Sequence, residues 1–234
     1  MATTIHIREI RPSEKEAREM ESLGLQAFTN VAMHSALFPR GEESREEQLR
    51  WRSQRFRTNL QNPMKHFVVA VEETEMDDGT SKDQIIGWAQ WAAPPAVPQP
   101  EKSEEEKAKE MQEKMRSWPD AMDKEAYKKI LEGFAELDKQ WLAGDDPTNY
   151  WVLDVLAVHP GHQRKGLGSK LTRWGIERAA KEGKGVGLIS RPTAKRLYAS
   201  LGFQTFGPER YAGGDSQTAM RLERPSRSAS ASSP

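Results

Sequence analysis

The chain has 234 residues and no cysteine, and its 35 lysine and arginine residues equal its 35 aspartate and glutamate residues. The lack of cysteine excludes disulfides, thiolate metal sites and cysteine nucleophiles, and the balanced charge gives no reason to expect general affinity for nucleic acid. No apolar run approaches the roughly 18 residues of a membrane span, and residues 1–11 lack the apolar core of a secretory signal. We therefore expect a soluble, cytoplasmic protein without membrane contacts.

The part of the chain before residue 92 predicts a strand, two helices and a β-hairpin. Ser13 and Glu16 have the spacing of a capping box, in which each side chain bonds the other residue's backbone amide. A polar turn between two apolar runs predicts the hairpin. The expected elements are a half-buried strand at 5–10, a helix after Ser13, a loop at 34–39, a charged helix at 42–59 and hairpin strands at 66–71 and 84–91.

Two apolar features of this part bear on a binding pocket. Leu37 and Phe38, in the expected loop, either fill the core or form a wall of an acceptor pocket, since long loops between helices often carry binding residues. Trp88 and Trp91 are three positions apart in one strand, so their side chains face opposite sides of the sheet. At least one of the two tryptophans is therefore expected over the pocket.

A long insertion at 92–146 interrupts the series of strands. It opens with Ala92–Pro100, whose prolines predict a stiff, extended spacer. Two helical segments follow at about 101–116 and 123–142, each with an apolar stripe on a charged surface. Fourteen acidic and nine basic residues lie between 101 and 146. We expect the insertion to pack on the flank of the sheet; as a lid over the acceptor site, its acidity would favour a cationic substrate such as an amine.

The most informative stretch runs from Tyr150 to Gly183. Its first nine residues are apolar or aromatic except Asp154, the pattern of a strand buried on both faces. A strand that enters a helix through glycines brings free amides and the positive end of the helix dipole to one place, which makes an anion site. Donors and positive charge come from Gln163, Arg164 and Lys165, while Gly166 and Gly168 leave room for a phosphate at the backbone.

The residues after Gly183 predict two more elements, a pair of closing strands and a tail. A short strand is expected at 185–190, and Pro192 occupies the first position of a helix that stops at Gly202. Segments 203–206 and 218–222 are expected to pair as closing strands. Residues 224–234 are rich in serine and predict a disordered tail.

Two common phosphate-binding loops do not fit the glycine-rich segment. Gly161 and Gly166 have the spacing of a Walker loop, but Leu167 stands where that loop requires lysine. A dinucleotide fingerprint requires a third glycine at the position of Leu171.

A third kind of loop does fit. The segment Gln163–Gly168 resembles the Arg/Gln-x-x-Gly-x-Gly/Ala signature of the GNAT superfamily of acetyl-CoA-dependent N-acetyltransferases. Leu156–Pro160 before it and Leu197–Phe203 after it resemble the same family in the same order. The resemblance covers roughly residues 150–206, and an ordinary strand, turn and helix with a solvated basic loop is the alternative.

The resemblance implies an α/β fold with a mixed sheet that splays between a fourth strand at 151–158 and a fifth at 186–190. Helices flank this sheet, and the helical insertion, about 95–147, joins its third and fourth strands within one domain at 1–223. Acetyl-CoA is the expected co-substrate, and no metal is expected. The implied contacts are the backbones of Leu156, Ala157 and Val158 for pantetheine, and Gln163, Arg164, Lys165, Gly166, Leu167, Gly168 and Ser169 for the pyrophosphate.

Acetyl transfer to an amine needs a neutral nucleophile, a polarised carbonyl and a proton for the departing thiolate. An alkylammonium has a pKa of about 10.4, so a base has to remove its proton. Asp154, the only charge in its strand, is the candidate base, and burial would strengthen it as a base; the alternatives are a structural carboxylate and a water relay. The resemblance also implies that the Leu156 amide polarises the thioester and that Tyr198 protonates the thiolate or packs against CoA.

The sequence therefore predicts an enzyme that moves acetyl from acetyl-CoA to the primary amine of a small molecule, directly within a ternary complex. A protein N-terminus or lysine is the alternative acceptor, and a non-catalytic CoA-binding sensor is the alternative of another class. His159 and His162 lie three positions apart without a third ligand nearby, so a zinc site is not expected. Neither the acceptor nor the oligomeric state is predicted.

Overall fold

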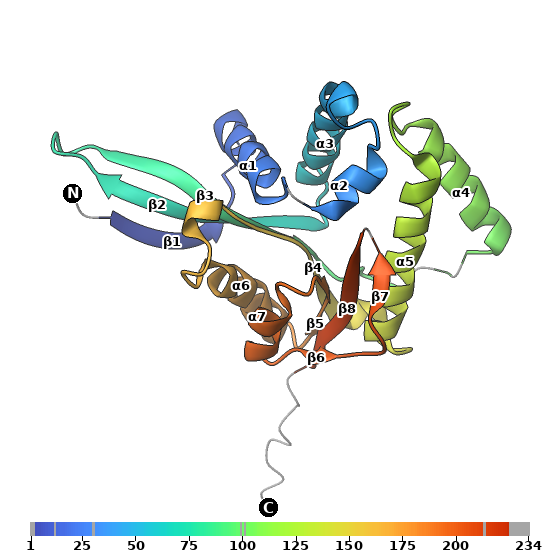
Figure 1. Cartoon of the computed structure of the whole chain (residues 1–234). Helices are drawn as coiled ribbons and strands as arrows, with labels where there is room; N and C mark the ends of the chain where they lie inside the picture. The colour runs from blue at the N-terminus through green and yellow to red at the C-terminus, as the bar shows by residue number, and fades with distance from the viewer. Residues whose placement is uncertain are drawn as a thin grey trace, which may run out of the picture.

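A computed structural model describes residues 3–11, 13–29, 31–98, 100, 102–212 and 214–224. Within these residues, a mixed sheet has the strand order β1-β2-β3-β4-β5-β8-β6, and β7 pairs with β8 (Figure 1). All neighbours are antiparallel except β4 and β5, which are parallel. The strands are β1 Thr3–Glu9, β2 Lys65–Glu75, β3 Ser81–Ala92, β4 Tyr150–Val158, β5 Gly185–Ser190, β6 Gln204–Thr205, β7 Arg210–Ala212 and β8 Asp215–Leu222.

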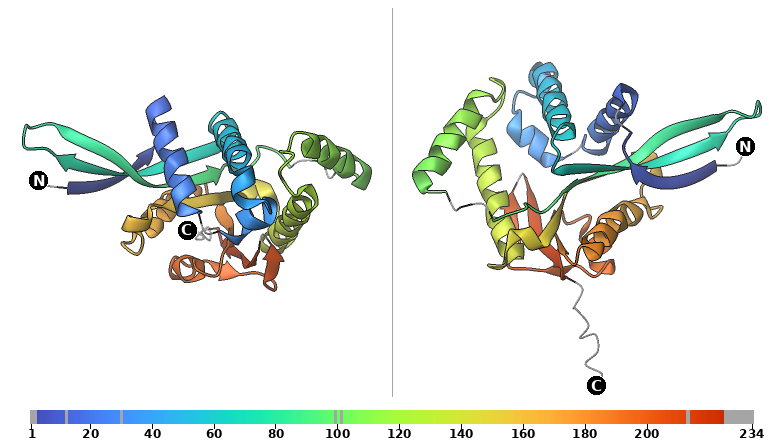
Figure 2. Two further views of the ribbon diagram at one scale, coloured as in Figure 1. Left: turned by 45° about the horizontal axis from the view of Figure 1, so that its top comes forward. Right: turned by 180° about the vertical axis from the view of Figure 1, so that it is seen from behind.

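Helices cover both faces of the sheet (Figures 1 and 2). Trp91 lies in the apolar cluster under α6, whereas Trp88 lies in the cluster under α1 and α3. The prediction that these two side chains face opposite sides of the sheet is confirmed. One face carries α1 Glu14–Ala27, α2 Ala32–Leu37 and α3 Arg45–Leu60; the other carries α6 Leu167–Lys181 and α7 Lys195–Ser200.

The start of α1 differs from the predicted capping box. The Ser13 hydroxyl accepts a hydrogen bond from the Glu16 amide at 3.2 Å, as expected. The Glu16 carboxylate, however, accepts from the Arg11 amide at 2.9 Å and pairs with Arg8 at 2.6 Å instead of reaching back to Ser13. A guanidinium on β1 is the stronger partner for a carboxylate, and the pair ties β1 to α1.

Three further local features differ from the sequence analysis. The expected loop at 34–39 contains the end of α2, although the expectation that Leu37 and Phe38 fill the core is confirmed by their exposure of 1% and 2%. Pro192 belongs to a turn that precedes α7, since the Ala194 amide bonds the Arg191 carbonyl and the helix begins only at Lys195. β7, a three-residue strand, was not predicted at all.

The helical insertion joins β3 to β4, as the sequence predicted. Its helices are α4 Glu104–Arg116 and α5 Lys124–Leu142. α5 packs its buried residues Leu137 and Trp141 beside Tyr150 and the strands β7 and β8. A Cβ added at Gly187 in β5 would lie 2.5 Å from the Trp141 ring, so only glycine admits the indole at this point. The insertion is thus part of the sheet's packing.

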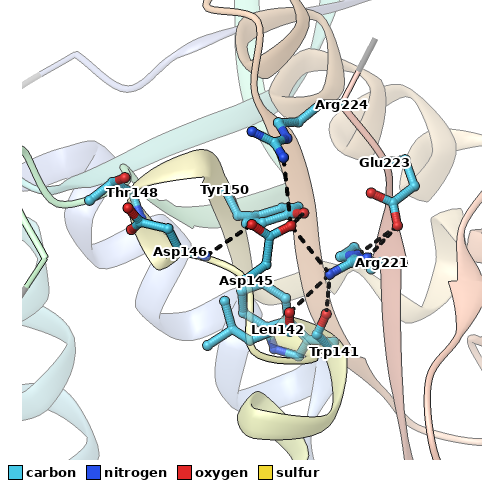
Figure 3. A network of polar contacts seen from close by, with 9 residues as sticks. All are labelled: Trp141, Leu142, Asp145, Asp146, Thr148, Tyr150, Arg221, Glu223 and Arg224. Carbon is cyan, nitrogen blue, oxygen red and sulfur yellow. Dashed lines mark hydrogen bonds and ion pairs between the residues drawn. The ribbon is translucent and has the colours of Figure 1, made fainter. Parts of the chain in front are cut away.

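A polar network fixes the end of α5 to the sheet (Figure 3). Arg221 on β8 donates hydrogen bonds of 3.0 Å to the carbonyls of Trp141 and Leu142, the last residues of the helix. The Tyr150 hydroxyl donates to Asp145 at 2.6 Å, and burial together with this carboxylate raises the pKa of Tyr150 to about 12. Arg224 also lies 3.7 Å from Asp145, whereas the rest of the predicted tail, 225–234, falls outside the described residues.

None of the helices in the described part of the chain has the length and hydropathy that a membrane crossing needs.

Candidate active site

The parallel strands β4 and β5 separate partway along their length. They are paired from Tyr150 with Gly185 to Leu153 with Leu188. Beyond this point β4 continues along β3 as far as Val158, while β5 continues along β8 as far as Ser190. The splayed sheet that the family resemblance implied is therefore present, and the second half of β4 has a neighbouring strand on one side only.

Asp154 lies at a β-bulge where this opening begins. Gln90 of β3 pairs with Val155, and the next residue, Trp91, pairs with Leu153, so Asp154 is the extra residue. Asp154 is exposed as a residue, and 26% of its side chain is accessible. The carboxylate is therefore partly accessible, whereas the sequence analysis expected a buried one.

The Asp154 carboxylate belongs to a polar network across three strands. Its Oδ2 lies 2.5 Å from the Lys65 ammonium and accepts a hydrogen bond of 3.0 Å from the Gln90 amide. Gln90 in turn accepts from Asn59 of α3 at 3.2 Å. Among the described residues, the second oxygen, Oδ1, has no hydrogen-bond partner, so one acceptor atom of this anchored carboxylate stays available.

Backbone groups of the open half of β4 alternate between β3 and the gap. The His159 amide donates to Ile86 of β3 at 2.9 Å, so Ala157, two residues earlier, also directs its backbone toward β3. Leu156 and Val158 direct theirs to the gap, where the Val158 carbonyl accepts from the Gln163 side chain at 3.1 Å. Of the three predicted strand contacts, Leu156 and Val158 thus face the gap and Ala157 faces the sheet.

The start of α6 presents unpaired amides beside this gap. Gly166, the N-cap residue, has φ +80° and Arg164 has φ +62°, and both lie in the left-handed region that turns the chain into the helix. No acidic residue occupies the first turn, and within the described chain no acceptor bonds the amides of residues 164–169. Uncapped amides and the helix dipole together suit an anion such as a pyrophosphate.

The two glycines of this loop serve different purposes. A side chain at Gly166 would meet nothing within 4 Å, so glycine is needed there for its backbone angles. A Cβ at Gly168 would lie 2.9 Å from Leu197 of α7 and 3.6 Å from Leu156 of β4. Glycine at 168 thus lets α6 pack closely on α7, and its role in leaving room for phosphate stays a prediction.

Tyr198 projects from α7 into the same region. It is 6% exposed and packs on Phe203 with ring centroids 5.8 Å apart. Its hydroxyl has no hydrogen-bond partner among the described residues, and burial raises the pKa of Tyr198 above its ordinary value. The phenol therefore stays protonated at neutral pH, as a proton donor must.

One cavity of about 730 Å³ joins the gap to the helices α1, α2, α3 and α5. The gap side is formed by β4 from Val152 to Leu156, by Val158 and Gln163, and by Tyr198. Trp88 lines this cavity, which identifies the tryptophan that the sequence left open. Leu37 also lines it, so this residue belongs both to the core and to the pocket wall.

The insertion supplies one wall of the cavity but not the expected acidity. It contributes Tyr127, Phe134 and Asp138, and Asp138 is the one charged residue among them. The Arg55 guanidinium donates to the Tyr127 hydroxyl at 2.6 Å and thereby links α3 to α5 over the pocket. The sequence analysis missed many of the polar and aromatic lining residues that the fold brings together, among them His34, Arg52, Arg55, Tyr127, Phe134 and Asp138.

The part of the cavity wall that α3 forms could have been recognised from helical spacing in the sequence. Arg52, Phe56 and Asn59 lie at positions i, i+4 and i+7 of α3, which is one face of a helix. The arginines looked like part of a solvated charged helix, because a periodicity does not say what lies opposite it.

Histidines do not form a metal site in the described part of the chain. No group of three or more histidine, aspartate or glutamate residues there is placed to hold an ion. His159 accepts a hydrogen bond from the Gly161 amide at 3.2 Å, and His162 lies 3.7 Å from Glu72.

A splayed mixed sheet with an uncapped helix at its opening defines an acyl-CoA transferase fold, and comparison with known proteins gives the family. Residues 99–224 match the profile described as "Acetyltransferase (GNAT) domain", more than half of the chain. The chain belongs to the GNAT acetyltransferase family and is an acyltransferase.

Individual relatives agree with this assignment. A curated acetyltransferase from Stachybotrys chartarum is 32% identical over 56 residues, which span 24% of this chain and 24% of that relative. The structure of the histone acetyltransferase HPA2 and related acetyltransferase from Corynebacterium glutamicum has a TM-score of 0.53 at 17% identity, covering 96% of this chain and 98% of that chain. The PaiA N-acetyltransferase from Thermoplasma acidophilum, in complex with coenzyme A, has a TM-score of 0.50 at 13% identity, covering 94% and 99%.

Proposed function

We propose that the protein transfers an acetyl group from acetyl-CoA to the primary amine of a small molecule, directly within a ternary complex. The observation that carries this proposal is the half-open cavity of about 730 Å³ that joins the open edge of β4 to the space between four helices. This volume is typical of sites that bind small molecules, so a small amine is the acceptor we favour over a protein segment.

Backbone groups are proposed to hold acetyl-CoA, the donor of an activated acetyl group. The gap-facing groups of Leu156 and Val158 would bond the pantetheine amides as an added strand does. The amides of Arg164 to Ser169 would bond the pyrophosphate, with the exposed side chains of Arg164 and Lys165 adding positive charge. Side-chain substitutions of Leu156 or Val158 should therefore act weakly, since the backbone makes the contacts.

Three groups are proposed to carry the transfer. The ammonium first loses one proton and becomes a neutral amine; its nitrogen then bonds the acetyl carbon while the carbon–sulfur bond breaks, it loses a second proton to solvent, and the thiolate gains one. Oδ1 of Asp154 takes the first proton from the ammonium, since Lys65 and Gln90 occupy only Oδ2. The Leu156 amide polarises the carbonyl oxygen, and the Tyr198 hydroxyl protonates the thiolate.

The test is an acetyl-CoA-dependent screen of amines, amino acids and polyamines, with release of free thiol as the readout. Thiol release with a small amine, lost in Asp154→Asn and Tyr198→Phe, supports the proposal. Acetylation of peptide N-termini or lysines without any small-molecule turnover would replace the acceptor by a protein. If coenzyme A binds but no amine causes thiol release, the protein is a coenzyme A-binding sensor and not an enzyme.

A further inference from the structure

Arg52 and Arg55 both line the cavity without an acidic partner among the described residues, and Arg55 donates instead to the Tyr127 hydroxyl at 2.6 Å. Arg57 on the same helix pairs with Glu14 at 3.0 Å, and Arg191 at the cavity edge pairs with Asp215 at 2.5 Å. Arg52 lines the cavity, and within the described part of the chain it donates one hydrogen bond, to the Gly24 carbonyl 3.4 Å away. Burial lowers the pKa of Arg52, with no carboxylate to counter the effect. A partly buried cation without a counter-charge is costly to the folded protein.

The surroundings of Arg52 do not supply a compensating negative charge. His34 of α2 lines the same part of the cavity, and its pKa is lowered to about 4, first by burial and then by Arg52. The acidic residues of the cavity are engaged elsewhere. Asp154 binds Lys65, Asp138 accepts from the Trp141 indole at 2.8 Å, and Glu21 lies 3.7 Å from Arg57.

The position of Arg52 along α3 relates it to the reacting end. Asn59, seven residues further on, reaches Asp154 through Gln90. At 1.5 Å per residue, the two α3 positions are about 10 Å apart along the helix. Phe56 lies between them and packs on Trp88 with ring centroids 5.6 Å apart. One molecule in this cavity can thus place one end at Arg52, an apolar middle on Phe56 and Trp88, and its other end at Asp154.

We infer that the acceptor amine carries an anionic group, a carboxylate or a phosphate, that binds the Arg52 guanidinium, with an apolar body between this group and the nitrogen. This assignment rests on the proposed function and names its substrate class. It replaces the cationic acceptor that the acidity of the insertion suggested, because Asp138 is the one acidic residue of the insertion that lines the cavity. A guanidinium binds carboxylate or phosphate with two parallel hydrogen bonds, whereas lysine offers a point charge.

The experiment compares matched amines with wild-type protein by thiol release. Phenylalanine is compared with phenethylamine, a series of ω-amino acids with alkylamines of equal length, and O-phosphoethanolamine with ethylamine. We expect kcat/KM to be about 10- to 100-fold higher for the anionic member of at least one pair, the range of one charged hydrogen-bonded contact. The pairs with a carboxylate and the pair with a phosphate show which anion is preferred. The ω-amino acid series shows which separation between the anionic group and the amine is preferred.

Arg52→Gln should remove this preference, while the KM for acetyl-CoA and the activity toward the uncharged member of the pair stay at wild-type values. Arg52→Lys should restore part of the preference, and Arg50→Gln, on the solvent side of α3, should leave it intact. Because Arg52 is an unneutralised charge, Arg52→Gln should not lower the Tm. If either Arg52 variant fails to fold, the wild-type comparison and the remaining variant still show whether Arg52 binds an anionic group of the acceptor.

Three results overturn the inference. If kcat/KM is equal for the charged and the uncharged member of every pair, the acceptor does not need an anionic group, and the proposed function still stands. An equal loss for both members in Arg52→Gln gives Arg52 a merely structural role. If no amine in the panel releases thiol although coenzyme A binds by calorimetry, the proposed function itself fails and the inference with it.

Discussion

Replacing Tyr198 by phenylalanine separates its proposed chemistry from its packing. Phenylalanine keeps the ring that contacts Phe203 at a centroid distance of 5.8 Å and removes only a hydroxyl that bonds no described residue. We therefore expect the Tm to change by less than about 2 °C, since no net hydrogen bond is lost. If the hydroxyl protonates the thiolate, kcat should fall by about 100-fold, the lower end of what general acid catalysis contributes.

The pH dependence adds a second check on Tyr198. Burial raises its pKa above the ordinary value of about 10. The wild-type phenol therefore stays protonated throughout the neutral range, and Tyr198→Phe should lose the same factor in kcat from about pH 6 to about pH 9. The assay is a thiol-release profile for both proteins at saturating acetyl-CoA. Wild-type kcat in the variant across this range would remove Tyr198 from the chemistry and leave it a packing role.

Three other predictions test the loop, the insertion and the pocket. Gly166→Val should raise the KM for acetyl-CoA about 10-fold and Gly166→Asn should not, because both side chains enter open space but only asparagine tolerates φ +80°; equal effects would refute a backbone cause. Arg221→Met loses the bonds to the Trp141 and Leu142 carbonyls and should lower the free energy of unfolding by about 2–3 kcal/mol in urea titrations; an unchanged midpoint would mean that the network does not hold the insertion. The folded-state pKa of His34 is lowered to about 4, so the unfolded chain binds the proton first and stability falls as pH drops from about 6.5 toward 4. His34→Gln should reduce this loss, and an identical acid profile in the two proteins would contradict the burial of the imidazole.

Periodicity and glycine signals predicted the large features of the fold. The polar turn between the apolar runs at 66–71 and 84–91 predicted the hairpin β2–β3, and the run at 150–158, apolar or aromatic except Asp154, predicted β4. The Gln163–Gly168 motif located the start of α6. These features are local, so a short stretch of sequence determines each of them.

Features set by distant residues were predicted poorly. The bulge at Asp154 depends on how Gln90 and Trp91 of β3 pair with β4, which no local pattern records. The Glu16 carboxylate does not accept from the Ser13 amide, as a capping box requires, because it pairs with Arg8 of β1 instead. Arg52 was hidden among the charges of α3, since its place in the pocket depends on where α1 and α2 lie.

The most direct test of the central claim is calorimetric titration of the purified protein with coenzyme A. The account predicts association at one site per chain, weakened by Gly166→Val and unchanged in Arg52→Gln, because the gap between β4 and β5 and the start of α6 make the contacts. No heat of association with coenzyme A or with acetyl-CoA would contradict it.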